Sequence, residues 1–384
     1  MKTTLALILV LAAACGDNAK SMPDGHPGGM TDGTETLDPL YKAVVVGADF
    51  SSGTGVVSRL DVSTLDMQQN AVPGAATSDP VLRKVGGSVY VINRSVGENV
   101  TILDAHTLAP TGQFSTGAGS NPQDVAVVGD KLYIPATGTA GVVVMTLPAG
   151  TTTTIDLASA VGDPDGKPDC VAAAVVGTDV YVACDLLDAA YTPRAAGKVA
   201  VIDTATDTVR TTLSLPFKNP QGFFVQTPAS SLFAGDLLIE TVPSFDTYTT
   251  GCLARVTPGA TPTAACAVTN MALGGFVTTA SIGDKLWLSV IVDANFSTVS
   301  GKLRSVDLAT GMLAPDAASA TSEQIGDLAA CPDPDHTIVA IDSKMNAEGV
   351  RVFSGGTERT TTAVPIGLPP IFSGGIVCYD VNHP

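Results

Sequence analysis

A short apolar core recurs seven times along the chain, and turn-forming residues such as Gly, Asp and Thr separate its copies. The central residues of these cores are Val45, Tyr90, Tyr133, Tyr181, Leu238, Trp287 and Val339. Consecutive centres lie 43 to 57 positions apart, which is the length of a four-stranded sheet rather than of a helical or leucine-rich repeat. The pattern predicts an all-β fold, a seven-bladed β-propeller of four-stranded antiparallel blades that occupies residues 41–384 as one domain.

Each repeat can be divided into four short strands, as the third repeat shows. Its strand segments are 124–128, 132–134, 142–145 and 152–155. Gly129-Asp130 between the first two is a two-residue hairpin signal, because Gly tolerates a positive φ. In four repeats the third strand ends in an Asp that is followed three positions later by Thr, at Asp61, Asp104, Asp203 and Asp307. Asp and Thr side chains accept backbone hydrogen bonds in turns, so we predict a structural role for these carboxylates.

The two ends of the repeat region complement each other. The chain enters at Val44 in a second strand and has no first strand for that blade, whereas residues 372–379 have the pattern of a spare first strand. We therefore predict that the C-terminal strand completes the first blade. Such closure leaves no exposed sheet edge that could pair with other chains.

Three stretches of the chain carry a family resemblance, and the third of them is residues 301–311. Residues 197–209 read GKVAVIDTATDTV and are followed by Asn-Pro-Gln-Gly at 219–222, and residues 100–117 lead into Asn-Pro-Gln-Asp at 121–124. They resemble the repeat of YVTN-type seven-bladed β-propellers. The resemblance covers most of residues 41–384 and is strongest in repeats two to four. It implies the seven-bladed fold and a location outside the cytoplasm, but little chemistry, because members of the family differ in function.

The N-terminus has the pattern of a secretory signal peptide over residues 1–14. Lys2 precedes an apolar run at 5–11 that is too short to span a bilayer, and small residues precede Cys15. The junction resembles a bacterial lipobox, which implies that Cys15 carries a lipid and becomes the first residue of the mature protein. Ordinary signal-peptidase cleavage after Ala14 is the alternative.

The resemblance to exported bacterial lipoproteins implies a protein anchored in the cell envelope, with the outer membrane as the expected location. Acyl chains contribute about 0.8 kcal/mol per buried methylene, so two or three of them hold a protein on a membrane essentially permanently. Residues 15–40 are rich in Gly, Pro and Asp and show no apolar period, so they are predicted to be a flexible tether.

Cysteine parity agrees with a lipid on Cys15, because an exported chain with seven cysteines otherwise has one odd thiol. Strand order suggests how the other six pair as disulfides. The expected pairs are Cys170 with Cys184, Cys252 with Cys266, and Cys331 with Cys378. The third pair would tie the ring near its closure. A zinc site is the competing interpretation, and it is disfavoured by the absence of any Cys-x2-Cys pair and by only four His.

The chain is acidic, with 20 Lys and Arg against 37 Asp and Glu and a formal net charge of −17. This charge repels phosphate backbones and anionic lipid headgroups. Nucleic acid is therefore not expected as a partner, and membrane contact is expected only through the lipid anchor. The propeller is expected to be a monomer.

First strands line the central channel of a propeller, and three of them begin with a carboxylate, at Asp124, Asp169 and Asp327. Together with Gly at the corresponding positions of other repeats, these residues predict an open acidic mouth for a cation or a polar ligand, with calcium as the metal to consider. In the alternative, the channel is filled with water and the three Asp are solvated or cap neighbouring strands. The segment 163–169 has alternating carboxylates like a calcium loop but lacks the distal Glu. No cofactor is identified.

The sequence contains no recognisable catalytic motif. Its four His fall at 26, 106, 336 and 383, in the tether, in two turns and at the C-terminus, and there is no P-loop or nucleophile elbow. An enzyme is therefore disfavoured. The predicted function is that of a cell-envelope lipoprotein that binds a protein, peptide or glycan partner, with the long loops 185–196 and 243–251 as the expected footprint. The alternatives are a propeller hydrolase of the lactonase type and a cation-binding envelope protein.

Overall fold

The structure, a computed structural model, describes residues 41–244, 247–293, 300–314 and 324–382. The chain divides into two units, Met1–Asp38 and Pro39–Pro384. Cys15, the expected signal peptide and the expected tether lie outside the described residues, as does a part of the predicted loop 243–251.

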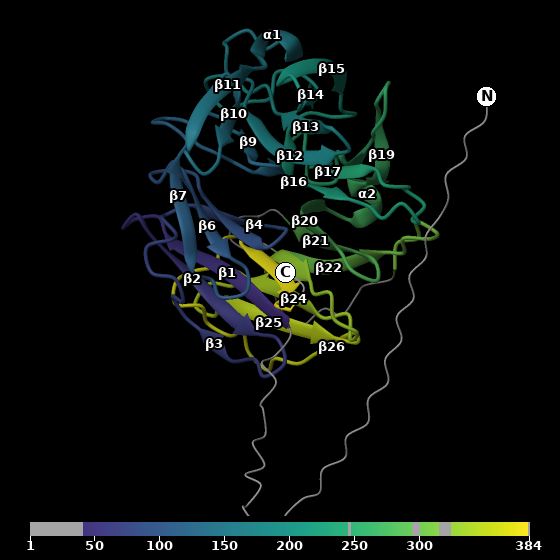
Figure 1. Cartoon of the computed structure of the whole chain (residues 1–384). Helices are drawn as coiled ribbons and strands as arrows, with labels where there is room; N and C mark the ends of the chain where they lie inside the picture. The colour runs from purple at the N-terminus through teal and green to yellow at the C-terminus, as the bar shows by residue number, and fades with distance from the viewer. Residues whose placement is uncertain (1–40, 245–246, 294–299, 315–323, 383–384) are drawn as a thin grey trace, which may run out of the picture. The chain divides into compact units, whose positions relative to one another are not determined.

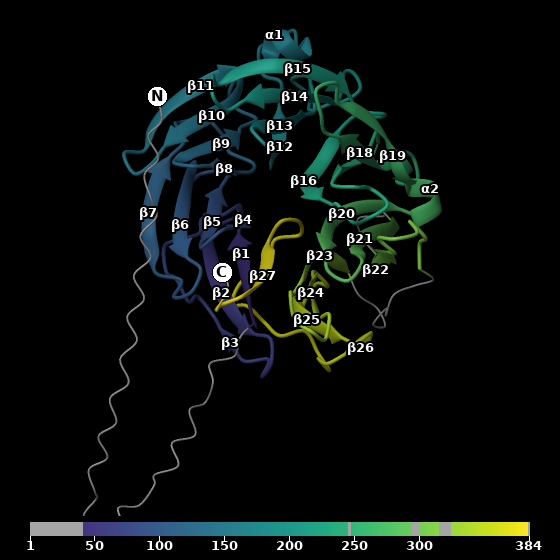
Figure 2. The same cartoon turned by 45° about the vertical axis from the view of Figure 1, so that its right-hand side comes forward.

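The second unit is a β-propeller whose seven antiparallel sheets stand around a common centre (Figures 1 and 2). We number the sheets as blades in chain order and give their strands from the centre outward. Blade 1 contains β27 (Ile376–Asp380), β1 (Tyr41–Asp49), β2 (Thr54–Asp61) and β3 (Met67–Gln68). Blade 2 contains β4 (Pro80–Val85), β5 (Ser88–Asn93), β6 (Asn99–Asp104) and β7 (Pro110–Ser115). Blade 3 contains β8 (Ala126–Val128), β9 (Lys131–Pro135), β10 (Gly141–Thr146) and β11 (Thr151–Asp156).

The remaining four blades repeat this order. Blade 4 contains β12 (Cys170–Val176), β13 (Asp179–Cys184), β14 (Lys198–Asp203) and β15 (Thr208–Ser214). Blade 5 contains β16 (Pro220–Gln226), β17 (Leu237–Thr241), β18 (Cys252–Thr257) and β19 (Thr263–Thr269). Blade 6 contains β20 (Phe276–Ile282), β21 (Leu286–Asp293) and β22 (Ser300–Val306), and residues 315–323, which follow it, lie outside the described ranges. Blade 7 contains β23 (Ile325–Ala330), β24 (Ile338–Asp342), β25 (Gly349–Ser354) and β26 (Thr357–Glu358). The all-β, seven-bladed propeller predicted from the sequence is confirmed.

The core lies between the blades, and this explains why the second strand carries the recurring apolar pattern. In blade 2, β5 is buried along nearly its whole length, whereas the outermost β7 is mostly exposed. Both sides of an inner strand pack against neighbouring blades, so consecutive apolar residues are buried rather than alternate ones. Two of the aromatic centres join blades: the Tyr133 hydroxyl donates to Asp207 of blade 4 at 2.5 Å, and the Tyr181 hydroxyl accepts from the Gly259 amide of blade 5 at 3.2 Å.

The ring closes as the two chain ends predict. β27 pairs antiparallel with β1, with Val377 opposite Val44, and so supplies the first strand that blade 1 otherwise lacks. The disulfide between Cys331 and Cys378 then joins blade 7 to blade 1. The pairs Cys170–Cys184 and Cys252–Cys266 each lie within one blade. All three predicted disulfides are present, and disulfides are typical of exported proteins.

Strand direction divides the connections between two faces of the ring. We call the turn face the one that carries the connections from first to second and from third to fourth strands. The predicted Asp turns lie there: at Asp104, for example, Oδ1 accepts from the Thr107 amide at 2.8 Å and from its hydroxyl at 2.7 Å. Asp61, Asp203 and Asp307 each accept from backbone amides two and three positions later. The structural role predicted for these carboxylates is confirmed.

The opposite side, which we call the loop face, carries the connections from second to third strands and from each blade to the next. Two one-turn helices, α1 (Ala158–Val161) and α2 (Asn270–Leu273), lie in blade-to-blade connections of this face. Within the described ranges, no helix is long and apolar enough to cross a membrane.

Candidate functional site

The loop face carries most of the exposed apolar side chains of the described residues. Seven of the nine that stand out lie in its connections: Phe50, Val96, Tyr191, Phe217, Met271, Met345 and Phe372. Only Leu232 and Met312 lie on the turn face. Exposed apolar side chains on one side of a molecule point to a contact surface, so the loop face is where a site should be sought.

A groove of about 500 Å³ opens on this face between the loops of blades 3 and 4. We call it the loop-face groove. Its polar and aromatic lining comes from four separate connections and includes Asn121, Thr137, Asp165, Asp169, Asp188 and Tyr191. The Tyr191 ring is 82% exposed, and its backbone φ of +58° is one that non-glycine residues rarely adopt. The predicted footprint 185–196 therefore forms one wall of the groove.

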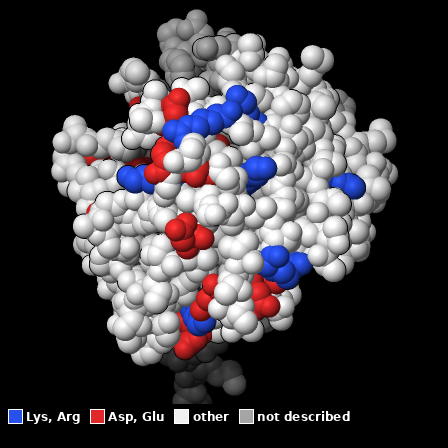
Figure 3. Space-filling model, turned by 90° about the horizontal axis from the view of Figure 1, so that it is seen from above, with Lys and Arg blue, Asp and Glu red and all other residues white. Residues whose placement is uncertain are grey.

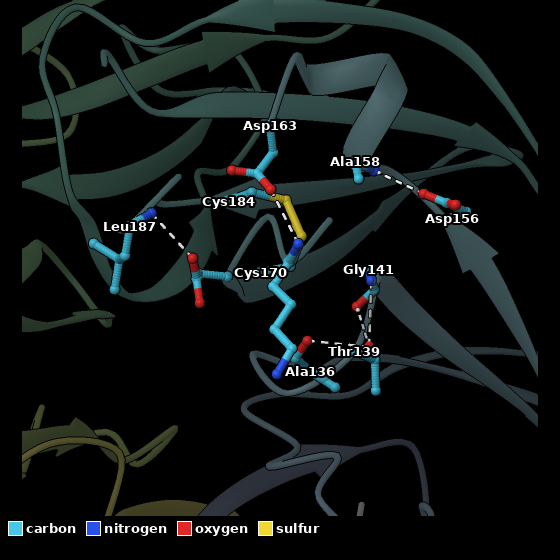
Figure 4. The surroundings of a disulfide bond; sticks show 11 residues. Ala136, Thr139, Gly141, Asp156, Ala158, Asp163, Cys170, Cys184 and Leu187 are labelled. Atoms are coloured by element: carbon cyan, nitrogen blue, oxygen red, sulfur yellow. Dashed lines mark hydrogen bonds between the residues drawn. A yellow bond between two sulfur atoms is a disulfide. The ribbon is translucent and has the colours of Figure 1, made fainter. Parts of the chain in front are cut away.

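Carboxylates and backbone amides shape the acidic wall of this groove. Asp163 lies beside the Cys170–Cys184 disulfide and its Oδ2 accepts from the Lys167 amide at 3.0 Å (Figure 4). Arg194 reaches across from the next loop to pair with Asp165 at 2.8 Å. These bonds bring the segment 163–169 and the loop 185–196 together, so the segment that resembles a calcium loop is instead held by its own amides and by a guanidinium.

Asp169 is the predicted channel residue that lies in this groove. Its Oδ2 accepts from the Leu187 amide at 3.0 Å, a bond seen at Leu187 in Figure 4, and its φ is +51°. Burial, reinforced by the neighbouring charges of Asp165 and Asp163, raises the pKa of Asp169 to about 6. The carboxylate therefore orders the loop that carries Tyr191.

Asp124 and Asp327 face the centre of the ring, but neither is open to solvent. Asp124 accepts from its neighbour's amide and, across to blade 4, from the Ala173 amide at 2.9 Å. Asp327 accepts from the Leu328 amide at 2.8 Å and, across to blade 1, from the Gly375 amide at 2.6 Å. Burial raises the pKa of both carboxyls, that of Asp327 to about 6. Asp124 and Asp327 therefore do not form the open acidic mouth that was predicted from the sequence. Each carboxylate instead accepts amides from two different blades.

Arg83 completes this network and was not singled out from the sequence. Its Nε lies 2.5 Å from Asp124 Oδ1, and its guanidinium stacks over the ring of Phe223 from blade 5. Burial lowers the pKa of Arg83, while the charges of Asp124 and Asp327 oppose that shift. The signal that could have drawn attention to it is that β4 is the one described first strand with basic residues, Arg83 and Lys84.

The segment before β27 lies near the centre of the ring, as the yellow loop in Figure 2 shows. Ser373 Oγ donates to the Thr278 carbonyl of blade 6 at 2.9 Å, and Gly374 packs against the Phe223 ring of blade 5. The closing segment thus contacts blades on the far side of the ring. A cavity of about 220 Å³ remains beside it, with Arg94, Asp185 and Ser373 among its lining residues.

Charged side chains are sparse on the surface seen from above in Figure 3, where acidic and basic groups lie side by side. Among the described residues, no three His, Cys, Asp or Glu side chains lie close enough together to hold a metal ion. His106 and His336 both lie in connections of the turn face, and His106 Nδ1 lies 3.1 Å from the Val381 carbonyl. Calcium at the channel stays a prediction.

The fold defines the class of this molecule as a seven-bladed β-propeller, and comparisons with known proteins agree. A periplasmic gluconolactonase of Pseudomonas aeruginosa, PpgL, superposes with a TM-score of 0.55 at 14% identity, over 88% of this chain and 98% of that one. A putative 6-phosphogluconolactonase of Bacteroides fragilis gives 0.56 at 10% identity, over 90% and 98%. AztD of Citrobacter koseri gives 0.52 at 12% identity, over 88% and 98%. At these identities the likeness concerns the fold alone.

No family model matches the chain, and no curated protein matches it in sequence. Membership of the YVTN-type family and lipidation of Cys15 therefore stay predictions.

Proposed function

We propose that the protein is a lipid-anchored binding module of the bacterial cell envelope, and that it captures a peptide segment of a partner protein in the loop-face groove. The groove itself carries this proposal, because it combines an exposed aromatic ring with carboxylates held at fixed positions. Tyr is enriched among the residues that dominate binding energy at protein interfaces. Here Tyr191 lies at the rim of a volume large enough for several side chains.

The charge of the groove favours a basic residue on the partner. Its lining contains three carboxylates, at Asp165, Asp169 and Asp188, and one cation, Lys167. The whole chain, with a formal net charge of −17, attracts a basic partner as well. A glycan that stacks on Tyr191 is the competing partner, and a comparison of probes separates the two.

Affinity capture from the native envelope with the anchored, full-length protein tests the proposal. We expect Tyr191→Ala to lose the captured partner and Phe50→Ala, which removes another exposed aromatic side chain from the loop face, to keep it. Binding of Lys-containing peptides, but not of neutral oligosaccharides, to the wild-type protein supports the peptide. The opposite selectivity favours the glycan, and equal capture by both variants contradicts the site.

The lipid anchor has a test of its own. We expect Cys15→Ala to release the protein from the membrane fraction after cell breakage, because the variant cannot carry the acyl chains that would hold the propeller on the membrane. Metabolic labelling with a fatty acid should mark the wild-type protein and not the variant. Unlabelled wild-type protein would contradict lipidation.

A lactone hydrolase is the second candidate. Two observations support it: the polar cavity of about 220 Å³ beside the closing segment, and the similar fold of solved propellers whose names include gluconolactonase. The cavity contains the Arg94 guanidinium, a group that can stabilise a developing oxyanion. Hydrolysis of gluconolactone above the spontaneous rate, abolished by Arg94→Gln, would support this candidate. A rate equal to that of buffer alone would remove it.

A further inference from the structure

The cavity beside the closing segment has the composition of a ligand site. We call it the channel cavity. Its volume of about 220 Å³ equals that of on the order of seven water molecules at ~30 Å³ each, which is the size of a small metabolite. Its lining includes Arg94, Gln123, Asp185, Gln221, Phe223 and Ser373, which come from four blades and from the closing segment.

Asp185 is the residue that points to the ligand. It directly follows β13, is only 5% exposed, and its Oδ1 has no hydrogen-bond partner among the described residues. Its backbone is fixed by the bond from its amide to the Asp169 carbonyl at 3.0 Å. An ionised carboxylate without a partner in such a place is costly, and buried charges in native proteins are generally paired or bound to a cation. The missing partner is therefore a cation or a hydrogen-bond donor.

The other polar groups of the cavity indicate an organic molecule rather than a metal ion. Arg94 pairs with Asp79 through a terminal nitrogen at 2.5 Å, but its buried Nε has no partner among the described residues. Gln123 uses its amide nitrogen to donate to Asn121. The Gln221 side chain makes no hydrogen bond to any described residue. A single carboxylate beside a guanidinium suits a cationic group that continues into a polar chain, whereas metals require several anionic ligands.

We infer that the channel cavity is a binding site for a small organic ammonium compound, with Asp185 as its counter-ion and Arg94 as a donor to the polar end of the ligand. The site is separate from the loop-face groove, although Asp169 contacts both the groove and the backbone of Asp185. It does not depend on the proposed peptide partner.

The protonation of Asp185 supports the assignment. Burial, first of all, and the nearby charge of Asp169 raise the pKa of Asp185 well above its usual range. The charged groups around the cavity are Asp169, Arg94 with its partner Asp79, and Arg83, which stacks on the Phe223 ring of the cavity wall and pairs with Asp124. Bound ammonium favours the ionised carboxylate, so binding releases a proton from Asp185 and affinity rises with pH.

Isothermal titration calorimetry with three matched probes tests the inference. The probes are n-butylamine, which carries only the ammonium, butyrate, which carries only the carboxylate, and 4-aminobutyrate, which carries both. We expect both amines to bind the wild-type protein at millimolar concentration or below, 4-aminobutyrate more tightly, and butyrate not to bind. Repeating the titration in two buffers of different ionisation enthalpy should reveal the released proton.

Asp185→Asn keeps the shape of the side chain and removes its charge, so it should weaken amine binding on the order of tenfold to hundredfold. Asp130→Asn on the turn face changes the net charge equally and should leave amine binding unchanged. The inference is overturned if neither amine binds wild-type protein, if butyrate binds as tightly as the amines, or if Asp185→Asn binds like wild type. The probe comparison uses only wild-type protein, so it stands even if Asp185→Asn folds poorly.

Discussion

The two faces of the ring join the same strands in different ways. On the turn face, four of the connections that follow third strands repeat one device, an Asp whose carboxylate accepts the backbone amide three positions later. On the loop face, each connection has its own length and composition. That face holds the groove, the buried Asp185 Oδ1 and Glu240 Oε2 atoms that have no partner among the described residues, and most of the exposed apolar side chains.

This difference separates what maintains the ring from what can bind. Short turns with satisfied hydrogen bonds fix strand register at little entropic cost, and they can be repeated because they depend only on local sequence. Buried polar groups without partners lower stability, and exposed apolar residues gathered on one side are typical of contact surfaces, so their concentration on the loop face indicates a function there. The following variants test that division.

The largest effect is expected from removal of the closing strand, on which both faces depend. Deletion of residues 372–384 leaves blade 1 without β27, removes the Cys331–Cys378 disulfide and exposes the edge of β1. We expect a loss of cooperative unfolding by calorimetry and strong aggregation by light scattering. A shorter deletion of residues 382–384, beyond β27, should behave like wild type. Unchanged unfolding of the long deletion would contradict the closure.

The elements that were predictable from the sequence depend on local patterns or on pairing between strands. The Asp turns follow from residues three positions apart, and the closure follows from an unpaired strand at each end of the repeats. The three disulfides follow from strand order.

The site was harder to predict because its contacts cross the ring. Asp124 is recognisable as a channel residue, but its role depends on Arg83 of blade 2 and Ala173 of blade 4. Similarly, nothing near Asp185 in the sequence reveals that its carboxylate is buried without a partner. The loop 185–196 could be recognised from its length alone. The groove could not, because it forms only where loops of two different blades meet.

A second effect is expected where the closing segment enters the channel. Gly374 has a φ of +76°, and a Cβ there would collide with the Phe223 ring. We expect Gly374→Ala to destabilise the protein by about 3 kcal/mol, from the backbone conformation and from overpacking. Gly74→Ala is the matched control, because Gly74 has a φ of +78° and open space around its Cα. Equal losses in denaturant unfolding would mean that the packing against Phe223 contributes nothing.

The third effect concerns Glu240, a buried carboxyl near the loop-face end of β17. Its Oε1 accepts from Asn270 at 2.8 Å, its Oε2 has no partner among the described residues, and it lines a cavity of about 20 Å³. Burial raises the pKa of Glu240 from 4.5 to about 8. The folded state therefore keeps a proton that the unfolded state loses, so this stabilisation is complete below pH 4.5 and is lost as the pH rises through about 8.

We expect Glu240→Gln, which stays neutral, to remove a decline in the free energy of unfolding on the order of 3 kcal/mol between pH 5 and 8. Denaturant unfolding of wild type and variant across that pH range measures this difference. Asp169 and Asp327, whose pKa values are also raised, lower the free energy of unfolding over the same range in wild type and variant alike. Glu348→Gln, at another loop-face connection, is the control. A variant with the same pH profile as wild type would show that Glu240 is ionised in the fold.

The smallest effects come from a matched pair of Asp turns, one on each face. Asp104 Oδ1 accepts from the Thr107 amide at 2.8 Å, and Asp188 Oδ1 accepts from the Ala190 and Thr192 amides at 2.8 and 3.0 Å. Either change to Ala should lower Tm by on the order of 1–2 °C, because each removes bonds at one exposed turn. Only Asp188→Ala should also weaken capture of the envelope partner, since its turn positions Tyr191 in the groove. If Asp104→Ala reduced capture equally, the loss would reflect general stability, and the two faces would not differ in function.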